Sequence, residues 1–315
     1  MIRKSIIIGL SGTKLTNQEI NILKKEKPWG VILFSRNIKN IKQVRSLTWN
    51  IRKIINDKKY PILIDEEGGS VSRLNKIINF DLFSQDFFGK LFIKNKRKFY
   101  NYYKIYIDQV SDILKNLGIN INTVPVLDVR RKNTHKIIFN RSYSSNPSIV
   151  SKIGMTCIDL YNRNKIATVI KHIPGHGLST YDSHKELPII FGKKNDLINK
   201  DFKAFKKCNS LFAMTAHIVY SDFDPIYTAT HSKNVIKKVI RKTIGFDGIL
   251  ISDDISMKAL KYGLVRNATR ALDAGCNLVL HCNGNIKEIK QLMKIVPSID
   301  KFTQKKTAQF RKLIE

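Results

Sequence analysis

Residues 167–184 read ATVIKHIPGHGLSTYDSH. The first four residues are an apolar, β-branched run typical of a buried strand, and the glycines and the proline that follow predict a loop. Three of the seven histidines of the chain lie in this loop. Because a histidine beside a carboxylate can act as a general acid or base, Asp182 and His184 make the loop a candidate for catalysis.

Seven further apolar runs resemble residues 167–170, and each precedes a polar or glycine-containing loop and then a helical pattern. The eight runs are residues 5–10, 30–34, 61–64, 120–127, 167–170, 211–216, 248–252 and 277–281. Continuously apolar strands that alternate with helices indicate a parallel sheet buried on both faces, and eight such strands close a barrel. We therefore expect an α/β fold, a (β/α)8 TIM barrel that forms a single catalytic domain over residues 1–315.

An open doubly wound sheet is the structural alternative. No glycine-rich dinucleotide fingerprint follows the first run, because Gly9 and Gly12 lack a third glycine at the required spacing. No linker, repeat or low-complexity tract divides the chain, and the longest insertion, residues 66–118, contains helical segments of its own.

Helix starts are marked by capping residues. Thr16 with Glu19 predicts a capping box, and Asn40, three residues before Gln43, predicts the start of a helix that ends near residue 57. Apolar periodicity predicts further helices over residues 108–117, 147–163, 195–206, 232–244, 257–274 and 286–295.

Composition narrows the class of protein. No apolar run approaches the roughly 20 residues that span a bilayer, so we expect a soluble chain with no membrane partner. The four cysteines lack CxxC spacing, which predicts reduced thiols in the cytoplasm and no zinc site; they are Cys157, Cys208, Cys276 and Cys282.

The net charge of +31, from 56 Lys plus Arg and 25 Asp plus Glu, taken alone suggests a polyanion partner. The basic residues are spread through every presumed helix, however, and we expect no specific nucleic-acid partner. The most tempting basic and aromatic stretch is residues 94–106. There Tyr103, Tyr106 and Val110 begin an apolar stripe at helical spacing, so most of these rings are interpreted as core contacts.

Polar residues follow the predicted strands where a barrel places its active site, at the C-terminal strand ends. They are Asp65, Asp128, Lys171, His172, His217, Asp253 and Asp254. Each alone is equally well explained as a solvated loop residue or a helix cap. Together they indicate a site.

Two chemistries could use this rim. A metal-dependent hydrolase could take His172, His176, Asp182 and His184 as ligands, but a Pro-Gly turn separates the first two, unlike a helical zinc motif.

Glycoside hydrolysis with retention needs instead a carboxylate nucleophile close to a general acid. Asp253 suits the first role and His184, polarised by Asp182, suits the second; Glu66, Glu67 and Glu186 are rival acids.

Six motifs carry a resemblance to a known family. They are KHIPGHGLSTYDSHKELP at 171–188, ISDDISMKA at 251–259, IDEEGG at 64–69, VPVLDV at 124–129, MTAH at 214–217 and ALDAGC at 271–276. Taken in chain order, they resemble the bacterial β-N-acetylhexosaminidases of glycoside hydrolase family 3, with a match from about residue 5 to 285, nearly the whole chain. The first two motifs are highly specific.

The resemblance implies a retaining exo-hydrolase that removes terminal β-linked N-acetylglucosamine, typically from cytoplasmic muropeptides during cell-wall recycling, without a cofactor or metal. By motif position it implies Asp253 as nucleophile and His184 with Asp182 as the acid/base pair. Its sugar-binding residues fall on Asp65, Arg73, Arg141, Lys171 and His172.

One position departs from the family pattern, which usually has Arg where this chain has Ser70. We expect a monomer whose partner is a small saccharide. The alternative from another class is a polyanion-binding barrel with lost or reduced catalysis.

Overall fold

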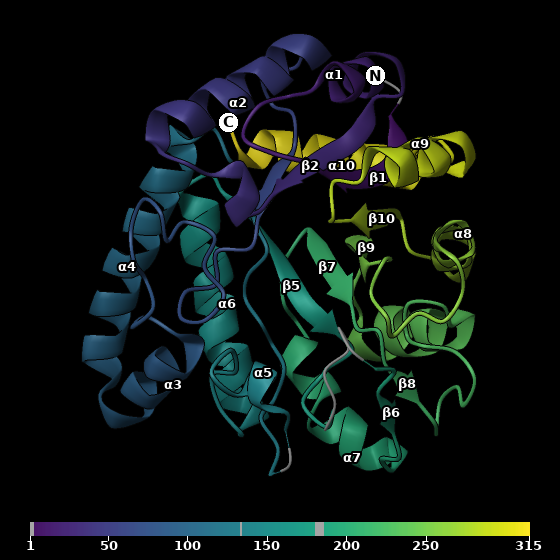
Figure 1. Cartoon of the computed structure of the whole chain (residues 1–315). Helices are drawn as coiled ribbons and strands as arrows, with labels where there is room; N and C mark the ends of the chain where they lie inside the picture. The colour runs from purple at the N-terminus through teal and green to yellow at the C-terminus, as the bar shows by residue number, and fades with distance from the viewer. Residues whose placement is uncertain (1–2, 133, 180–185) are drawn as a thin grey trace.

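Eight parallel strands close into a barrel in the computed structural model, which describes residues 3–132, 134–179 and 186–315 (Figure 1). In their order around the barrel they are β1 (Lys4–Gly9), β2 (Pro28–Leu33), β3 (Ile62–Ile64), β4 (Ile121–Asn122), β5 (Ala167–Ile173), β7 (Phe212–Thr215), β9 (Ile249–Asp254) and β10 (Leu278–His281). Each overlaps one of the eight predicted runs, so the expected TIM barrel is confirmed.

Most strand residues are apolar because both faces of the strands are buried, and Lys171, His172, Asp253 and Asp254 lie at the C-terminal ends. Alternate residues of β1 enter two different clusters: Ile7 joins a cluster with Leu63 and Val169, while Ile6 and Ile8 pack with residues of the surrounding helices. This alternation follows from the two-residue period of a strand, with one face toward the barrel interior and one toward the helices.

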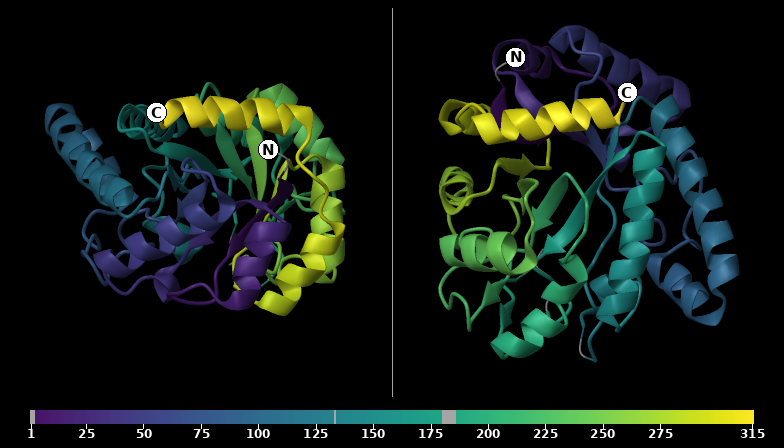
Figure 2. Two further views of the ribbon diagram at one scale, coloured as in Figure 1. Left: turned by 90° about the horizontal axis from the view of Figure 1, so that it is seen from above. Right: turned by 180° about the vertical axis from the view of Figure 1, so that it is seen from behind.

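The helices surround the barrel (Figure 2). They are α1 (Asn17–Lys25), α2 (Ile41–Ile55), α3 (Gln85–Lys94), α4 (Lys96–Asn116), α5 (Lys136–Phe139), α6 (Pro147–Arg163), α7 (Lys194–Asn199), α8 (Leu264–Ala274), α9 (Ile286–Ile295) and α10 (Lys301–Leu313), with a π-helix at Val235–Ile244 and 3-10 turns at Ser35–Asn37 and Phe202–Phe205. The predicted starts at Thr16 and Asn40 are confirmed, since each side chain accepts a hydrogen bond from the helix backbone.

Three predicted helices have clearly different bounds. The helix expected over residues 108–117 is the last part of α4, which begins at Lys96. The stretch 195–206 is divided into α7 and a 3-10 turn, and the helix expected to begin at residue 257 begins at Leu264. There Asp254 accepts hydrogen bonds from the backbone and hydroxyl of Ser256, so the apolar residues just after β9 form a turn at the barrel rim. A short sheet of β6 (Ile189–Ile190) and β8 (Val219–Tyr220) was not predicted.

Helix α10 lies across the end of the barrel where the strands begin (Figure 2). Its Phe310 packs against Trp29 near the start of β2 and Phe212 at the start of β7, with ring centroids 6.3 and 5.7 Å away. The Trp29 indole N–H donates to Thr307 Oγ1 at 2.9 Å. The helix therefore closes the end of the barrel opposite the predicted site. Within the described residues, no helix has the length and apolar character to cross a membrane.

Replacing Phe310 by alanine should lower the free energy of unfolding by about 3–4 kcal/mol, because a fully buried ring leaves a cavity that the barrel end cannot refill. Phe302→Ala on the same helix, where 38% of the residue is exposed, is the matched control and should cost less than about 1 kcal/mol. Urea unfolding of both variants measures the difference. Equal losses would show that α10 does not close the barrel.

Candidate active site

A cavity of about 270 Å³ opens at the C-terminal end of the barrel strands. Its lining is Phe34, Asp65, Glu67, Val71, Arg73, Ile138, Arg141, Lys171, His172, His176, Met214, Asp253, Asp254, Leu280 and Cys282. Six of the eight predicted site residues are therefore gathered in one place, from β3, β5, β9 and the loops after β3 and β4. The other two, Asp182 and His184, lie outside the described residues.

Lys171 on β5 lies at the centre of the charged part of the cavity. Its ammonium group is 2.7 Å from Glu67 and 3.3 Å from Asp65, and it donates to Thr123 Oγ1 at 2.9 Å. Only 3% of the residue is exposed. Burial of an ammonium group is costly unless it is paired, and these three oxygen partners supply that pairing.

Glu67 is held by two cations. The guanidinium of Arg141 donates to both of its carboxylate oxygens at 2.8 Å, and Lys171 contacts the same group. Burial would raise the pKa of Glu67, but Arg141 and Lys171 lower it to about 2. A carboxylate that stays ionised at neutral pH cannot donate a proton, so Glu67 is unsuited to the role of general acid. No local sequence pattern predicts the ion pair between Glu67 and Arg141, because the two residues are 74 positions apart.

Asp65 follows β3 and holds the other end of the charged group. Arg73 donates to it at 3.1 Å, and Thr123 donates its hydroxyl to the second oxygen. Burial opposes ionisation, yet Lys171 and Arg73 bring the pKa of Asp65 far below its usual range. The Arg73 guanidinium also lies over the ring of Phe34, 5.2 Å from its centroid. Asp65 and Arg73 thus present oriented hydrogen-bonding groups to a polar ligand.

His172 is oriented by Asp128, which sequence reasoning placed on the rim without a role. The Asp128 carboxylate is 2.7 Å from His172 Nδ1 and accepts the backbone N–H groups of His172 and His176. Asp128 is fully buried, yet its pKa is lowered despite that burial, with His172 as the main cause. The opposite ring nitrogen of His172 lies 3.4 Å from Arg141 Nη2. The arrangement fixes the imidazole at the cavity wall.

Asp253 and Asp254 end β9 at the cavity. The Asp253 carboxylate accepts the N–H of Asp254 at 2.8 Å, and both residues are partly exposed. His217, two residues after β7, donates its Nε2–H to the carbonyl oxygen of Asp254 and shares a hydrogen bond with the Thr230 hydroxyl through Nδ1, and burial lowers its pKa. Asp253 thus lines the same cavity as Arg73, Arg141 and Lys171, while Asp254 and His217 hold the strand end.

Both flanks of residues 180–185 are fixed to this rim. Before the segment, Thr134 donates to the carbonyl of Gly177 at 2.6 Å and His135 N–H donates to Ser179. After it, the carbonyl of Pro188 accepts the N–H of Val219. These contacts hold Gly177, Ser179 and Pro188 in place, while Asp182 and His184 between them lie outside the described residues.

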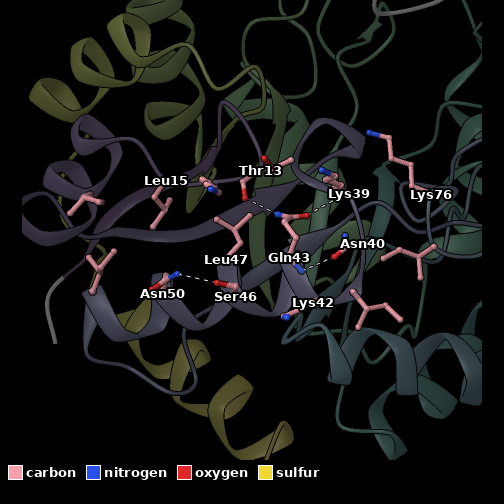
Figure 3. Close-up of a pocket in the computed structure, with 15 residues that line it drawn as sticks. Thr13, Leu15, Lys39, Asn40, Lys42, Gln43, Ser46, Leu47, Asn50 and Lys76 are labelled. Carbon is pink, nitrogen blue, oxygen red and sulfur yellow. Dashed lines mark hydrogen bonds between the residues drawn. The ribbon is translucent and has the colours of Figure 1, made fainter.

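A second and larger cavity, of about 1080 Å³, lies between α1 and α2 (Figure 3). At its centre Gln43 donates to the carbonyl of Thr13 at 2.7 Å. Its lining contains lysines, amides and aliphatic residues but no Asp, Glu or His. It lacks the groups for acid-base or nucleophilic chemistry, so the smaller cavity is the candidate active site.

In the described part of the chain no three His, Cys, Asp or Glu side chains lie close enough together to hold an ion; Asp182 and His184, two of the four candidate metal ligands, lie outside that part. Among these residues all four cysteines are free thiols, and burial raises the pKa of Cys282, beside the cavity, well above its usual value.

Glu66 turns away from the cavity and positions the loop that carries Arg73. One carboxylate oxygen accepts the hydroxyl of Ser72 at 3.0 Å and the backbone N–H groups of Arg73 and Leu74 at 2.9 and 3.0 Å. Burial raises the pKa of Glu66 to about 7, although these donors oppose the shift. Glu66, one of the alternative candidates for the general acid, is thus a buried residue that fixes its own loop.

The raised pKa predicts a pH dependence of stability. Because the folded protein holds the Glu66 proton more tightly than the unfolded chain, this group stabilises below its unfolded pKa near 4.5, and the stabilisation is lost as the pH rises toward about 7. In Glu66→Gln, which does not titrate, unfolding free energy relative to wild type should rise by roughly 3 kcal/mol across that window.

Urea unfolding at several pH values measures the trend. Glu288→Gln is the control, because hydrogen bonds from Asn283 and His281 lower the pKa of Glu288 and reverse the sign of the effect. A flat difference between Glu66→Gln and wild type would contradict the raised pKa.

Comparison with known proteins places this site in a family. The family model described as "Glycosyl hydrolase family 3 N terminal domain" matches residues 4–314. A beta-hexosaminidase of Haemophilus ducreyi is 33% identical over 98% of this chain and 89% of its own length. One from Hydrogenovibrio crunogenus is 32% identical over 92% of this chain and 82% of its own length.

Solved structures agree with the sequence comparisons. Native NagZ from Neisseria gonorrhoeae superposes with a TM-score of 0.88 at 26% identity, covering 100% of this chain and 90% of that one. A family 3 β-N-acetylglucosaminidase from Paenibacillus gives a TM-score of 0.85 at 25% identity and covers 98% of this chain, which spans 60% of that longer protein. The cavity lined by Asp253 and the buried ion pairs is therefore the candidate active site of a glycoside hydrolase, and the chain belongs to glycosyl hydrolase family 3.

Proposed function

We propose that this glycoside hydrolase is an exo-β-N-acetylglucosaminidase that acts with retention of configuration through a covalent glycosyl-enzyme on Asp253. The observation that carries the proposal is the position of Asp253. It ends a buried barrel strand and shares one cavity with Lys171 and Arg141. A carboxylate at a strand end facing fixed hydrogen-bond donors can attack a sugar carbon that those donors hold in place.

The proposed sugar-binding group is Asp65, Arg73, Arg141, Lys171 and His172. The ion pairs among them keep the carboxylates and cations charged and fix their directions, as a site for several hydroxyl groups requires. The cavity of about 270 Å³ accommodates a single sugar ring more readily than a chain, which supports cleavage of a terminal residue.

The proposed acid/base is His184, with Asp182 as its partner. The two carboxylates nearest the charged group are poor rivals, since Glu67 stays ionised in two ion pairs and Glu66 is bound to its own loop. An imidazole beside a carboxylate titrates near neutrality without burial, which suits a residue on a loop. The fixed flanks at Gly177 and Pro188 support delivery of this pair to the cavity.

For the physiological substrate we propose a muropeptide fragment with a terminal N-acetylglucosamine, processed in the cytoplasm by a single catalytic domain that acts as a monomer without a cofactor. The support is the likeness to bacterial beta-hexosaminidases along nearly the whole chain. Turnover of matched aryl N-acetylglucosaminides and glucosides would test the 2-acetamido preference on which this proposal depends.

Asp253→Asn should reduce turnover of an aryl β-N-acetylglucosaminide at least roughly 1,000-fold while sugar binding persists, because the amide cannot form the glycosyl-enzyme. In the wild type, NMR of the first-formed product should show the β anomer. Asp254→Asn is the control and should retain most activity, because Asp254 holds the turn at Ser256. A first-formed α anomer, or an active Asp253→Asn variant, would exclude the mechanism.

His184→Ala should be slowed by roughly 100-fold or more on substrates with poor leaving groups and much less on activated aryl substrates, because only the former need a proton. Initial rates on an alkyl and a dinitrophenyl glycoside compare the two cases. Ser179→Ala, on the described flank, provides a matched loop control. Equal losses on both substrates would remove His184 from the role of acid.

A further inference from the structure

The surface of residues 78–105 concentrates exposed apolar side chains. Among residues whose side chains the structure describes, seventeen large apolar residues are exposed, and eight of them lie in this stretch. The most exposed are Leu82 at 82%, Ile93 at 63%, Ile105 at 58% and Tyr102 at 52%. Because so large a fraction falls in so short a stretch, these residues form a patch, and such patches on soluble proteins mark interaction sites.

Several of these side chains form one continuous strip. The ring of Phe83 stacks on Tyr106 with centroids 5.5 Å apart and contacts Phe87 at 6.1 Å. Tyr102 lies one helical turn before Tyr106 on α4, and Ile105 lies one turn after Tyr102. The strip therefore runs from the loop before α3, across the start of that helix, and onto the outer side of α4.

Positive charge is concentrated where these two helices meet. Residues 87–107 contain six Lys or Arg and no Asp or Glu. Lys90 and Lys104 pair with Asp86 and Asp108, which flank the segment. The remaining four, residues 94 and 96–98, are exposed at the junction of α3 and α4 and make no ion pair with any described residue. Cations thus border the apolar strip at one end.

We propose that the α3–α4 hairpin binds the surface of a membrane that contains anionic lipids. Exposed aliphatic and phenyl groups flanked by Lys and Arg are the composition with which a helix rests in the interfacial region, where the apolar groups enter and the cations contact headgroups. The location agrees with this role, since α4 lies at the outer margin of the molecule in both views of Figure 2.

Other occupants fit the surface less well. A second copy of the chain would place the same unpaired cations against each other. Nucleic acid would gain from stacking on the four exposed rings of the stretch, but it would leave the aliphatic side chains Leu82, Ile93 and Ile105 without an apolar partner. The hairpin is also firmly attached to the barrel, because Asp86 pairs with Arg130 at 2.6 Å and Gln85 accepts the N–H of Val126. Binding of the hairpin to a membrane would therefore hold the whole molecule at that membrane.

Co-sedimentation of the full chain with vesicles tests the proposal. Wild type should pellet with phosphatidylcholine vesicles that contain about 30% phosphatidylglycerol, and not with phosphatidylcholine alone. The charge variant Lys96→Gln/Arg97→Gln/Lys98→Gln and the apolar variant Tyr102→Ser/Ile105→Ser should each lower the bound fraction about fivefold or more. Aryl-glycoside turnover and melting curves should match those of the wild type.

A second triple variant separates the patch from the net charge of the chain. Lys233→Gln/Lys237→Gln/Lys238→Gln removes the same charge from an exposed helix face elsewhere and should change binding less than twofold, roughly. Equal loss in both triple variants, or unchanged binding of the apolar variant, would reduce the effect to general electrostatic adsorption and overturn the proposal. Binding to a DNA duplex but not to anionic vesicles would also overturn it.

Discussion

The buried ammonium group of Lys171 is the interaction on which the rest of the site depends. It joins two carboxylates, Asp65 and Glu67, each of which holds a guanidinium on its other side, from Arg73 and Arg141. Positive and negative groups thus alternate through a region that is almost closed to water. Without Lys171 the two carboxylates would face each other in a medium that screens their repulsion poorly, so the alternation is what permits so many charges at the end of a barrel.

The alternating charges also set the electrostatic environment of Asp253, which lines the same cavity. Three cations against two carboxylates leave one positive charge in the group, and Asp253 lines the same cavity. A nucleophilic carboxylate must be ionised, and a nearby positive excess favours that state. The cationic group therefore has two effects at once: its hydrogen-bond donors can orient sugar hydroxyls, and its net charge complements the carboxylate that is proposed to attack. Both effects come from side chains of the chain itself.

The barrel could be predicted from the sequence because each of its strands is marked by a local pattern of apolar residues. A run such as residues 167–170 is apolar at every position, which only a strand buried on both faces requires, and the residue after it must then lie at the rim. Lys171 and Asp65 were found in this way. Arg73 and Arg141 came only from the family resemblance, because both lie on irregular loops where no period marks a direction. The mutual pairing of Glu67 with Arg141 depends on tertiary contact.

The errors in the predicted helix ends and the failure to predict what contacts the exposed side of α4 have the same cause. Apolar residues just after β9 suggested an early helix start, but the rim places them in a turn held by Asp254. In residues 94–106 the periodicity predicts Tyr103 and Tyr106 as core rings, and both are buried, but it leaves out Phe99, which is buried as well. It did not say what covers the exposed Tyr102. A sequence pattern shows which side of a helix is buried against its own chain. It cannot show what an exposed side will contact. A single exposed ring such as Tyr102 needs no explanation, but eight exposed apolar side chains concentrated in residues 78–105 form a candidate binding surface.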